Sequence, residues 1–208
     1  MNFIQFREDT YPLGLFSSKQ INLMYPGFNN DNLVYWQKKG YIIKIRNGWY
    51  CHADFLAVPD HHCLIANNIY SPSYISHQFA LNHYGMIPEH ILDITSMTTR
   101  KTASFSFKGR VLKYYSVKKE LFFGYILTEI IVNGMKRNIQ MAEKEKALLD
   151  MLYSFNFYKT KQDLEYLRLN DYILNTEFDW NKCYQYADRM KVIILENKLK
   201  LIQKIYCK

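Results

Sequence analysis

The chain has 208 residues, of which 49% are hydrophobic and 22% charged, so it is long enough to bury one large core or two small ones. Its net charge of +8 favours an anionic partner, and the excess is spread as +2, +3 and +3 over residues 1–56, 57–156 and 157–208. This even spread excludes a histone-like basic tail. No apolar run approaches the roughly 20 residues that a membrane-spanning helix needs.

The cysteines and the first residues indicate the compartment. Four cysteines lie far apart and form no C-x-x-C pair, which favours reduced thiols over a disulfide framework. The first ten residues contain Glu8 and Asp9 and lack the basic and apolar segments of a secretory leader. We therefore expect a cytoplasmic protein that does not bind membranes.

Residues 1–56 carry the signals of three short helices followed by a hairpin. The first helix begins near Phe3 and breaks at residues 12–14, the second covers residues 19–24, and the third begins near Asn30 and stops at Gly40. Leu33 and Trp36 are three apart, so they face the core together. Asn47-Gly48 then separates two extended apolar runs, which predicts a hairpin with a type I′ turn. Such parts form a winged helix-turn-helix.

The third helix and the hairpin carry the residues that we expect to contact DNA. In a winged helix-turn-helix the third helix enters the major groove, and the wing reaches the backbone or the minor groove. Asparagine can read adenine edges, whereas lysine and tyrosine suit phosphates or guanine. The candidate DNA-binding residues are Lys19, Asn30, Asn32, Tyr35, Lys38, Lys39, Lys44 and Arg46. The alternative is that Lys38 and Lys39 form an ordinary solvated helix end and that the domain docks on a protein.

Residues 57–156 predict a mixed α/β domain. A helix over residues 60–69 precedes a strand-helix-strand unit, Ser73–Phe107, whose helix starts at Ser76 as N-cap and ends at Gly85. Further extended segments follow, the last two joined by a second Asn-Gly turn at residues 133–134, so we expect four or five strands in a mixed sheet. A helix beginning at Ala142 completes the domain.

Three features of this region resemble sites, and each has a structural explanation that we favour. His61-His62-Cys63 are adjacent on a helix and point in different directions, so they do not form a metal site. Glu143 is a candidate general base, but Glu143–Lys146 alternate in charge as a solvated helix face does. The basic and aromatic segment 100–119 can hold nucleic acid by charge and stacking, or form a hairpin with its aromatic residues inward. We expect no catalytic residue, no bound cofactor and no metal.

Residues 157–208 predict a helical extension. Segments 161–174, 179–190 and 191–206 read as three helices, and the apolar stripe of the last is too wide to stay exposed to water. The predicted fold class is therefore α+β, with an N-terminal winged helix-turn-helix at 1–56, a mixed α/β domain at 57–156 and a helical C-terminal extension at 157–208.

Three segments together resemble the AbiEi family of antitoxins over about residues 17–153. They are YISHQFALNHYGMIPE, MAEKEKALLDMLY and the pattern L-x-x-W-x-x-x-G-Y-I-x-x-I-x-N-G-W-Y, matched at Leu33, Trp36, Gly40, Ile42, Ile45, Gly48 and Tyr50. A Thr-rich strand and a turn centred on Gly109 lie between the first two segments, and this order is part of the resemblance. The resemblance implies a transcriptional autoregulator of a type IV toxin–antitoxin or phage abortive-infection operon. It also implies that the protein counteracts a nucleotidyltransferase-like toxin, with direct contact not required.

The expected function is thus a DNA-binding antitoxin, not an enzyme, that represses its own operon. Its expected partner is double-stranded promoter DNA, where inverted repeats would suit a homodimer. One alternative is a winged-helix transcriptional regulator whose C-terminal domain senses a ligand or docks a protein partner. Another is an enzyme acting on nucleic acid or nucleotides, but its nucleotidyltransferase, deaminase and Walker motifs are missing.

Overall fold

The computed structural model describes residues 1–207, which divide into two compact units. The first unit comprises residues 1–69 and 128–139, and the second comprises the rest of the described chain. Helices hold 47% of the residues and strands 23%, so the predicted α+β class is confirmed. The domain boundaries that the sequence suggests after residues 56 and 156 stay a prediction.

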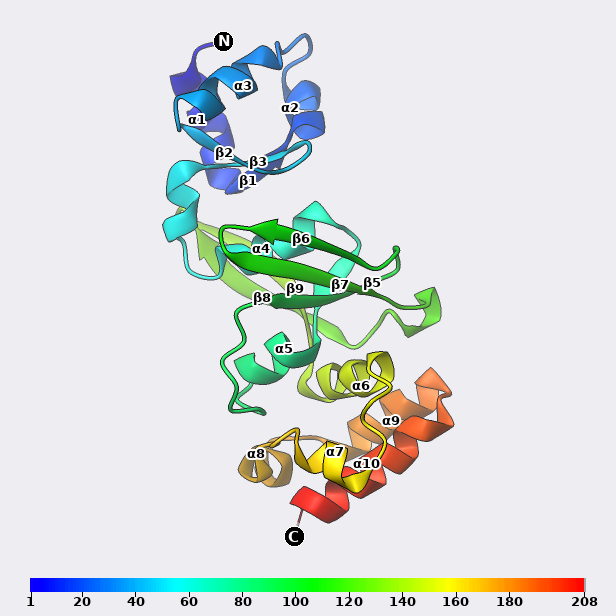
Figure 1. Ribbon diagram of the computed structural model, residues 1–208. Helices are drawn as coiled ribbons and strands as arrows, with labels where there is room; N and C mark the ends of the chain where they lie inside the picture. Colours follow the sequence, from blue (N-terminus) through cyan, green and yellow to red (C-terminus); the bar gives the residue numbers. More distant parts are fainter. Residues whose placement is uncertain (208) are drawn as a thin grey trace. The chain divides into compact units, whose positions relative to one another are not determined.

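The first unit begins with the expected helices and hairpin (Figure 1). Its elements are α1 (Phe3–Thr10), η1 (Tyr11–Leu13), β1 (Leu15–Ser17), α2 (Ser18–Met24), α3 (Asp31–Lys38), β2 (Ile42–Arg46), β3 (Trp49–His52), η2 (Ala53–Ala57) and α4 (His61–Ile69). The three strands form an antiparallel sheet in the order β1-β3-β2. The short strand β1 thus joins the hairpin β2–β3 through β3.

An aromatic core holds the three helices on this sheet. Leu33 and Trp36 are buried, as their spacing predicts, and the Trp36 ring lies 4.5 Å from that of Phe6. Phe6 also meets Phe16 of β1 edge to face at 5.3 Å. Each large apolar side chain that is fully buried contributes roughly 1.5–3 kcal/mol. The buried residues on the inner face of α3 therefore fix the position of this helix, and residues on its outer face can be replaced without disturbing the core.

The turn at Asn47-Gly48 differs from the predicted type I′ turn. Such a turn needs positive φ at both central residues, and only Gly48 has it, at 77°. The register of β2 against β3 shifts between Lys44 and Arg46, because Lys44 pairs with Tyr50 whereas Arg46 pairs with Trp49. A bulge in β2 therefore takes up the twist that a type I′ turn would have supplied.

His52 at the end of β3 is buried and neutral in this core. Its Nε2 lies 2.8 Å from the Thr10 hydroxyl, which itself donates to the Phe6 carbonyl, so the ring donates to Thr10. Its Nδ1 is buried and makes no hydrogen bond within the described chain. Burial lowers the pKa of His52 from 6.5 to about 4, against a raising effect of Asp54.

Acid is expected to destabilise the protein through this residue. Because the folded pKa lies below the unfolded value, the unfolded state binds the proton first, and stability falls as pH drops below 6.5 towards about 4. At about pH 5 the loss attributable to His52 is roughly 2 kcal/mol. Urea unfolding at about pH 7 and about pH 5 checks this, since His52→Gln should lose roughly 2 kcal/mol less over that interval than the unmodified protein. Parallel losses in the two proteins would contradict the assignment.

A long hairpin contributes its tip to the first unit. It consists of β8 (Tyr125–Val132) and β9 (Met135–Ala142), and at its turn both Asn133 and Gly134 have positive φ, at 49° and 78°. The Asn133 amide donates to the Tyr11 carbonyl at 2.8 Å, and Arg137 donates twice to the Pro12 carbonyl, from Nε at 3.1 Å and from Nη2 at 2.5 Å. The hairpin tip is thus fixed to η1.

A mixed sheet forms the centre of the second unit. Its further strands are β4 (Ser73–Ile75), β5 (Ile94–Thr98), β6 (Ala103–Phe107) and β7 (Arg110–Ser116), with α5 (His77–His83) after β4 and η3 (Lys119–Leu121) after β7. The six-stranded order is β6-β7-β5-β4-β9-β8, with parallel pairs β5/β7 and β4/β9. The predicted mixed sheet is therefore confirmed, with one strand more than expected.

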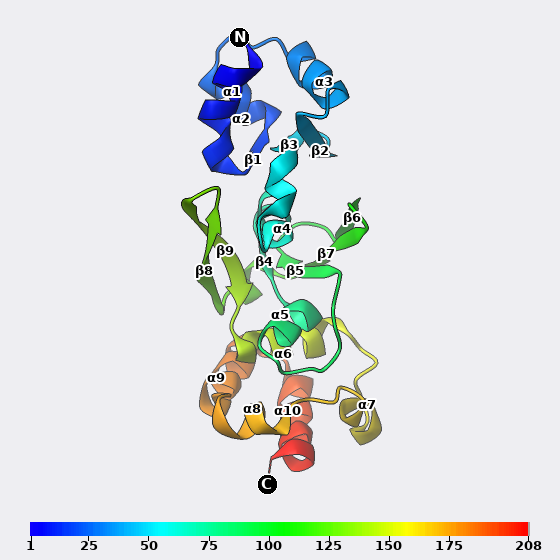
Figure 2. The same cartoon turned by 90° about the vertical axis from the view of Figure 1, so that its left-hand side faces the viewer.

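Five helices complete the second unit (Figure 2): α6 (Lys144–Ser154), α7 (Lys161–Glu165), α8 (Asp171–Thr176), α9 (Trp180–Met190) and α10 (Ile193–Tyr206). α6 packs against α5 on one side and against α9 and α10 on another. The single helix predicted over residues 161–174 is wrong, because Arg168 adopts a left-handed conformation with φ 49° and separates α7 from α8.

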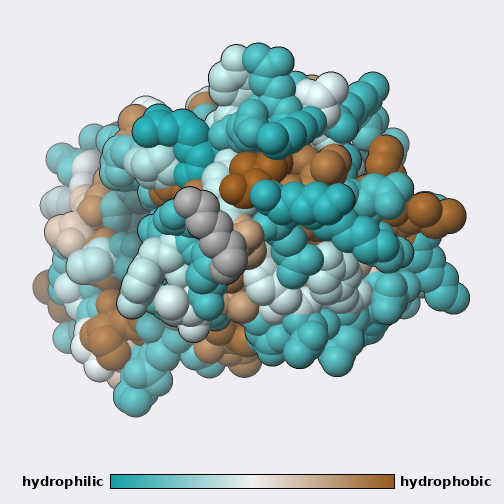
Figure 3. Space-filling model, turned by 90° about the horizontal axis from the view of Figure 1, so that it is seen from below, coloured by the Kyte–Doolittle hydropathy of each residue, from teal (hydrophilic) through white to brown (hydrophobic). Residues whose placement is uncertain are grey.

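The surface around the last helices is mostly hydrophilic, with separate hydrophobic patches (Figure 3). Leu195, Leu199 and Ile202 of α10 are buried, but Ile193 is 82% exposed, so the apolar stripe of this helix is only partly covered. None of the helices in residues 1–207 combines the length and the hydropathy needed to cross a bilayer.

Candidate functional site

The outer face of α3 presents most of the predicted DNA-binding residues. Asn30, Lys38 and Lys39 are exposed, Tyr35 is 55% exposed, and Asn32 is half-buried. The Lys39 ammonium lies 5.7 Å from the centre of the Tyr35 ring, and neither Lys38 nor Lys39 has an ion pair within residues 1–207. The C-terminal half of this face is therefore positively charged.

The beginning of α3 leaves the Asn30 side chain unused. Asn30 is the N-cap residue, but its side chain makes no capping bond; the Asn29 carbonyl oxygen Oδ1 instead accepts the Asp31 N–H at 2.9 Å. The side-chain amide of Asn30 is therefore available to donate and accept hydrogen bonds with a bound partner. Asp31 is exposed and favours the helix N-terminus, but it places one negative charge beside Asn30.

The start of α2 is bonded to the hairpin turn. The Ser17 hydroxyl caps α2 by accepting the Gln20 N–H at 3.1 Å, and the Ser18 N–H donates to the Gly48 carbonyl at 2.8 Å. Exposed Lys19 follows directly, and exposed Lys44 lies on β2 of the same hairpin. The exposed lysines among the candidate DNA-binding residues thus lie on α2 and on the hairpin as well as at the end of α3.

Arg46 differs from the other candidates. It is half-buried, and its Nη1 donates to the Ile69 carbonyl at the end of α4 at 3.0 Å. Because the last carbonyls of a helix lack partners within it, a guanidinium there satisfies one of them and complements the helix dipole. Because this contact holds the guanidinium at the end of α4, we expect Arg46 to contribute more to stability than to phosphate binding.

Arg46→Ala is therefore expected to change stability more than DNA affinity. Loss of this charged hydrogen bond should cost about 1–2 kcal/mol of unfolding free energy, whereas affinity for DNA should fall by less than about threefold. Chemical denaturation and a gel shift on the same preparation measure both quantities. Lys44→Ala is the matched control, and it should show the opposite pattern.

Three of the seven basic side chains in segment 100–119 of the second unit make contacts within that unit. The Arg100 guanidinium lies 4.1 Å from the centre of the Tyr70 ring, Arg110 donates to the Leu92 carbonyl at 2.9 Å, and Lys113 pairs with Asp93 at 2.8 Å. Phe107 and Tyr114 are buried, and Phe105 and Tyr115 are half-buried. The prediction that the aromatic residues of this hairpin point inward is therefore confirmed for Phe107 and Tyr114.

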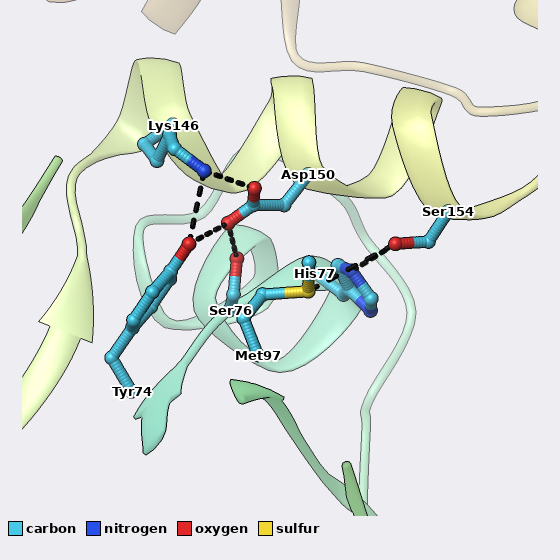
Figure 4. A network of polar contacts seen from close by, with 7 residues as sticks. All are labelled: Tyr74, Ser76, His77, Met97, Lys146, Asp150 and Ser154. Atoms are coloured by element: carbon cyan, nitrogen blue, oxygen red, sulfur yellow. Dashed lines mark hydrogen bonds and ion pairs between the residues drawn. The ribbon is translucent and has the colours of Figure 1, made fainter. Parts of the chain in front are cut away.

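A buried polar network links α6 to the end of β4 (Figure 4). Lys146 and Asp150 are one helical turn apart and form an ion pair with both side chains 0% exposed. The Lys146 ammonium donates to the Tyr74 hydroxyl at 2.9 Å, and Asp150 Oδ2 accepts from the hydroxyls of Tyr74 at 2.9 Å and of Ser76 at 2.8 Å. The predicted solvated face at Glu143–Lys146 is therefore wrong.

Burial governs the electrostatics of this network. It raises the pKa of the Asp150 carboxyl, an effect that the Lys146 ammonium and the two hydroxyls oppose, and it raises the pKa of Tyr74 well above 10.

Contrary to the prediction from the sequence, the hydroxyl of Ser76 does not cap α5, because it donates to Asp150 instead. The backbone N–H of Phe79 donates to the Thr95 hydroxyl at 3.2 Å. With no exposed atom for a substrate to reach, the network holds β4, α5 and α6 together.

Glu143, the candidate general base, and His77 of α5 also contact other side chains. Glu143 accepts from Lys182 Nζ at 2.5 Å and from the Tyr186 hydroxyl at 2.5 Å, so it joins α6 to α9. His77 is fully buried, its Nε2 lies 3.0 Å from the Ser154 hydroxyl, and burial lowers its pKa from 6.5 to about 3. Within residues 1–207, no three His, Cys, Asp or Glu side chains are placed to hold a metal ion.

No protein-family model matches the chain, and no curated protein matches it.

Proposed function

We propose that the chain is a DNA-binding antitoxin whose residues 1–56 form a winged helix-turn-helix. The observation that carries the proposal is the order of elements in residues 3–52, helix, strand, helix, helix, strand, strand, with the sheet order β1-β3-β2. In this assignment α3 is the recognition helix and the hairpin β2–β3 is the wing.

The distribution of polar groups over these elements supports this assignment. Asn30 and Tyr35 lie on the outer face of α3 and can contact base edges, and Lys38 and Lys39 at its end suit phosphates. Lys19 on α2 and Lys44 on the wing add charge where backbone contacts are expected in this fold. Arg46 is left out of the interface because its guanidinium is held by the Ile69 carbonyl.

The antitoxin part of the proposal rests on the resemblance of three segments to the AbiEi family. In this proposal the protein acts in the cytoplasm, represses its own operon, and counteracts a nucleotidyltransferase-like toxin encoded beside it. The second unit, with its buried network, would then carry the antitoxic activity. Two copies of the protein would bind an inverted repeat in the promoter.

A gel shift on the DNA upstream of the gene tests the repressor part. We expect saturable binding that survives an excess of unrelated competitor DNA. Binding to the upstream fragment and to the competitor with equal affinity would refute it.

A growth assay tests the antitoxin part separately. The neighbouring reading frame is induced alone and together with this chain, and we expect growth arrest in the first case and growth in the second. A neighbour that is harmless alone, or whose toxicity this chain does not relieve, would refute the antitoxin part and leave the repressor part standing.

A further inference from the structure

A cavity of about 320 Å³ lies within the first unit. Three leucines give it an apolar wall, and polar side chains and an indole complete its lining: Gln20 of α2, Trp49 of β3, Asn68 of α4, and Arg137 and Asn138 of β9. Its size falls at the lower end of the range of small-molecule sites, about 300–1,000 Å³. It is therefore large enough for a small ligand and too small for a peptide.

The polar groups around this cavity have unused hydrogen-bonding capacity. Within residues 1–207, the indole N–H of half-buried Trp49 and the side-chain amides of Gln20 and Asn138 have no hydrogen-bond partner. Buried or half-buried indole N–H groups normally find an acceptor. The NH₂ of Asn68 donates to the Leu64 carbonyl at 2.8 Å, which leaves its Oδ1 unused.

Arg137 supplies the charge of the site. Its Nε and Nη2 both donate to the Pro12 carbonyl, so the guanidinium is fixed and Nη1 remains without a partner among the described residues. The lining contains no carboxylate. A fixed guanidinium without a counter-ion favours an anionic group, and phosphate suits its geometry.

These groups match the parts of one ligand class. An indole face offers stacking to a nucleobase, side-chain amides can pair with the donor and acceptor on a base edge, and the guanidinium can take a phosphate. We propose that this cavity binds a nucleoside monophosphate. Gln20 and Trp49 belong to α2 and the wing, so a bound nucleotide would contact two elements of the DNA interface; this consequence alone rests on the proposed function.

Isothermal titration calorimetry of the full-length protein without DNA tests the proposal. AMP, GMP, CMP and UMP are titrated separately, with inorganic phosphate as the probe for the anionic group alone. Asn138→Asp adds a carboxylate to the exposed rim of the cavity without removing a packed side chain. Asn22→Asp makes the same change on the exposed face of α2 outside the lining, and circular dichroism melting confirms that both variants fold.

We expect at least one nucleotide to bind with a stoichiometry of one and more tightly than inorganic phosphate. Asn138→Asp should weaken this binding by about tenfold through charge repulsion, and Asn22→Asp by less than about twofold. The proposal is overturned if no nucleotide binds saturably, if inorganic phosphate binds as tightly as every nucleotide, or if the two variants weaken binding equally. Because no DNA is present, failure here leaves the gel-shift result of the proposed function unaffected.

Discussion

Replacing Asp150 with alanine is expected to lower the free energy of unfolding by about 3–5 kcal/mol. The substitution leaves the Lys146 ammonium fully buried without its counter-ion, and it removes the acceptor of the Tyr74 and Ser76 hydroxyls. An uncompensated buried charge costs far more than a lost surface ion pair. Urea denaturation followed by circular dichroism measures the loss.

Two control variants separate this cause from a general loss of packing. The double variant Lys146→Met with Asp150→Leu removes both charges, and it should be within about 2 kcal/mol of the unmodified protein. Glu165→Ala removes an exposed pair with Lys161, also four residues apart, and should cost less than about 0.5 kcal/mol. If Asp150→Ala costs no more than Glu165→Ala, Lys146 is not held as a buried charge.

Reversing Lys38 and Lys39 to glutamate is expected to reduce affinity for the upstream DNA by at least about 100-fold. Both side chains are exposed on the end of α3, so their substitution should leave the melting temperature within a few degrees. The reversal removes two phosphate contacts and adds repulsion from the same backbone. The change in affinity is measured by gel shift at one fixed salt concentration.

The matched control is the reversal of Lys118 and Lys119, two adjacent exposed lysines in the basic segment of the second unit. It changes the net charge by the same amount, so long-range attraction to DNA is reduced equally. We expect a loss of less than about fivefold. A larger loss from this control than from the α3 variant would move the DNA interface to the second unit.

The sequence predicts the elements of the first unit well because its signals are local. A serine N-cap marks α2, Asn-Gly marks the hairpin, and the spacing of Leu33 and Trp36 sets the inner face of α3. The predicted type I′ turn at Asn47-Gly48 is wrong because β2 contains a bulge. A bulge depends on how two strands pair, and the sequence of either strand alone does not predict that pairing.

The sequence failed where distant segments decide the environment. The alternating charges of Glu143–Lys146 are typical of a solvated helix face, yet α6 is covered on several sides, by α5, α9 and α10. Lys146 and Asp150 have the i, i+4 spacing of a surface ion pair, and segments distant in the sequence bury the pair, among them Tyr74, 72 residues before Lys146. The environment of Arg46 is likewise decided by a distant residue, because its guanidinium donates to the carbonyl of Ile69, 23 positions later.

The most direct test of the central claim, that α3 and the wing bind DNA, is the salt dependence of affinity for the upstream DNA. The logarithm of the association constant should fall linearly with the logarithm of salt concentration, and the Lys38, Lys39 reversal should reduce the slope by about two. An unchanged slope in that variant, or no saturable binding at any salt concentration, would contradict the claim.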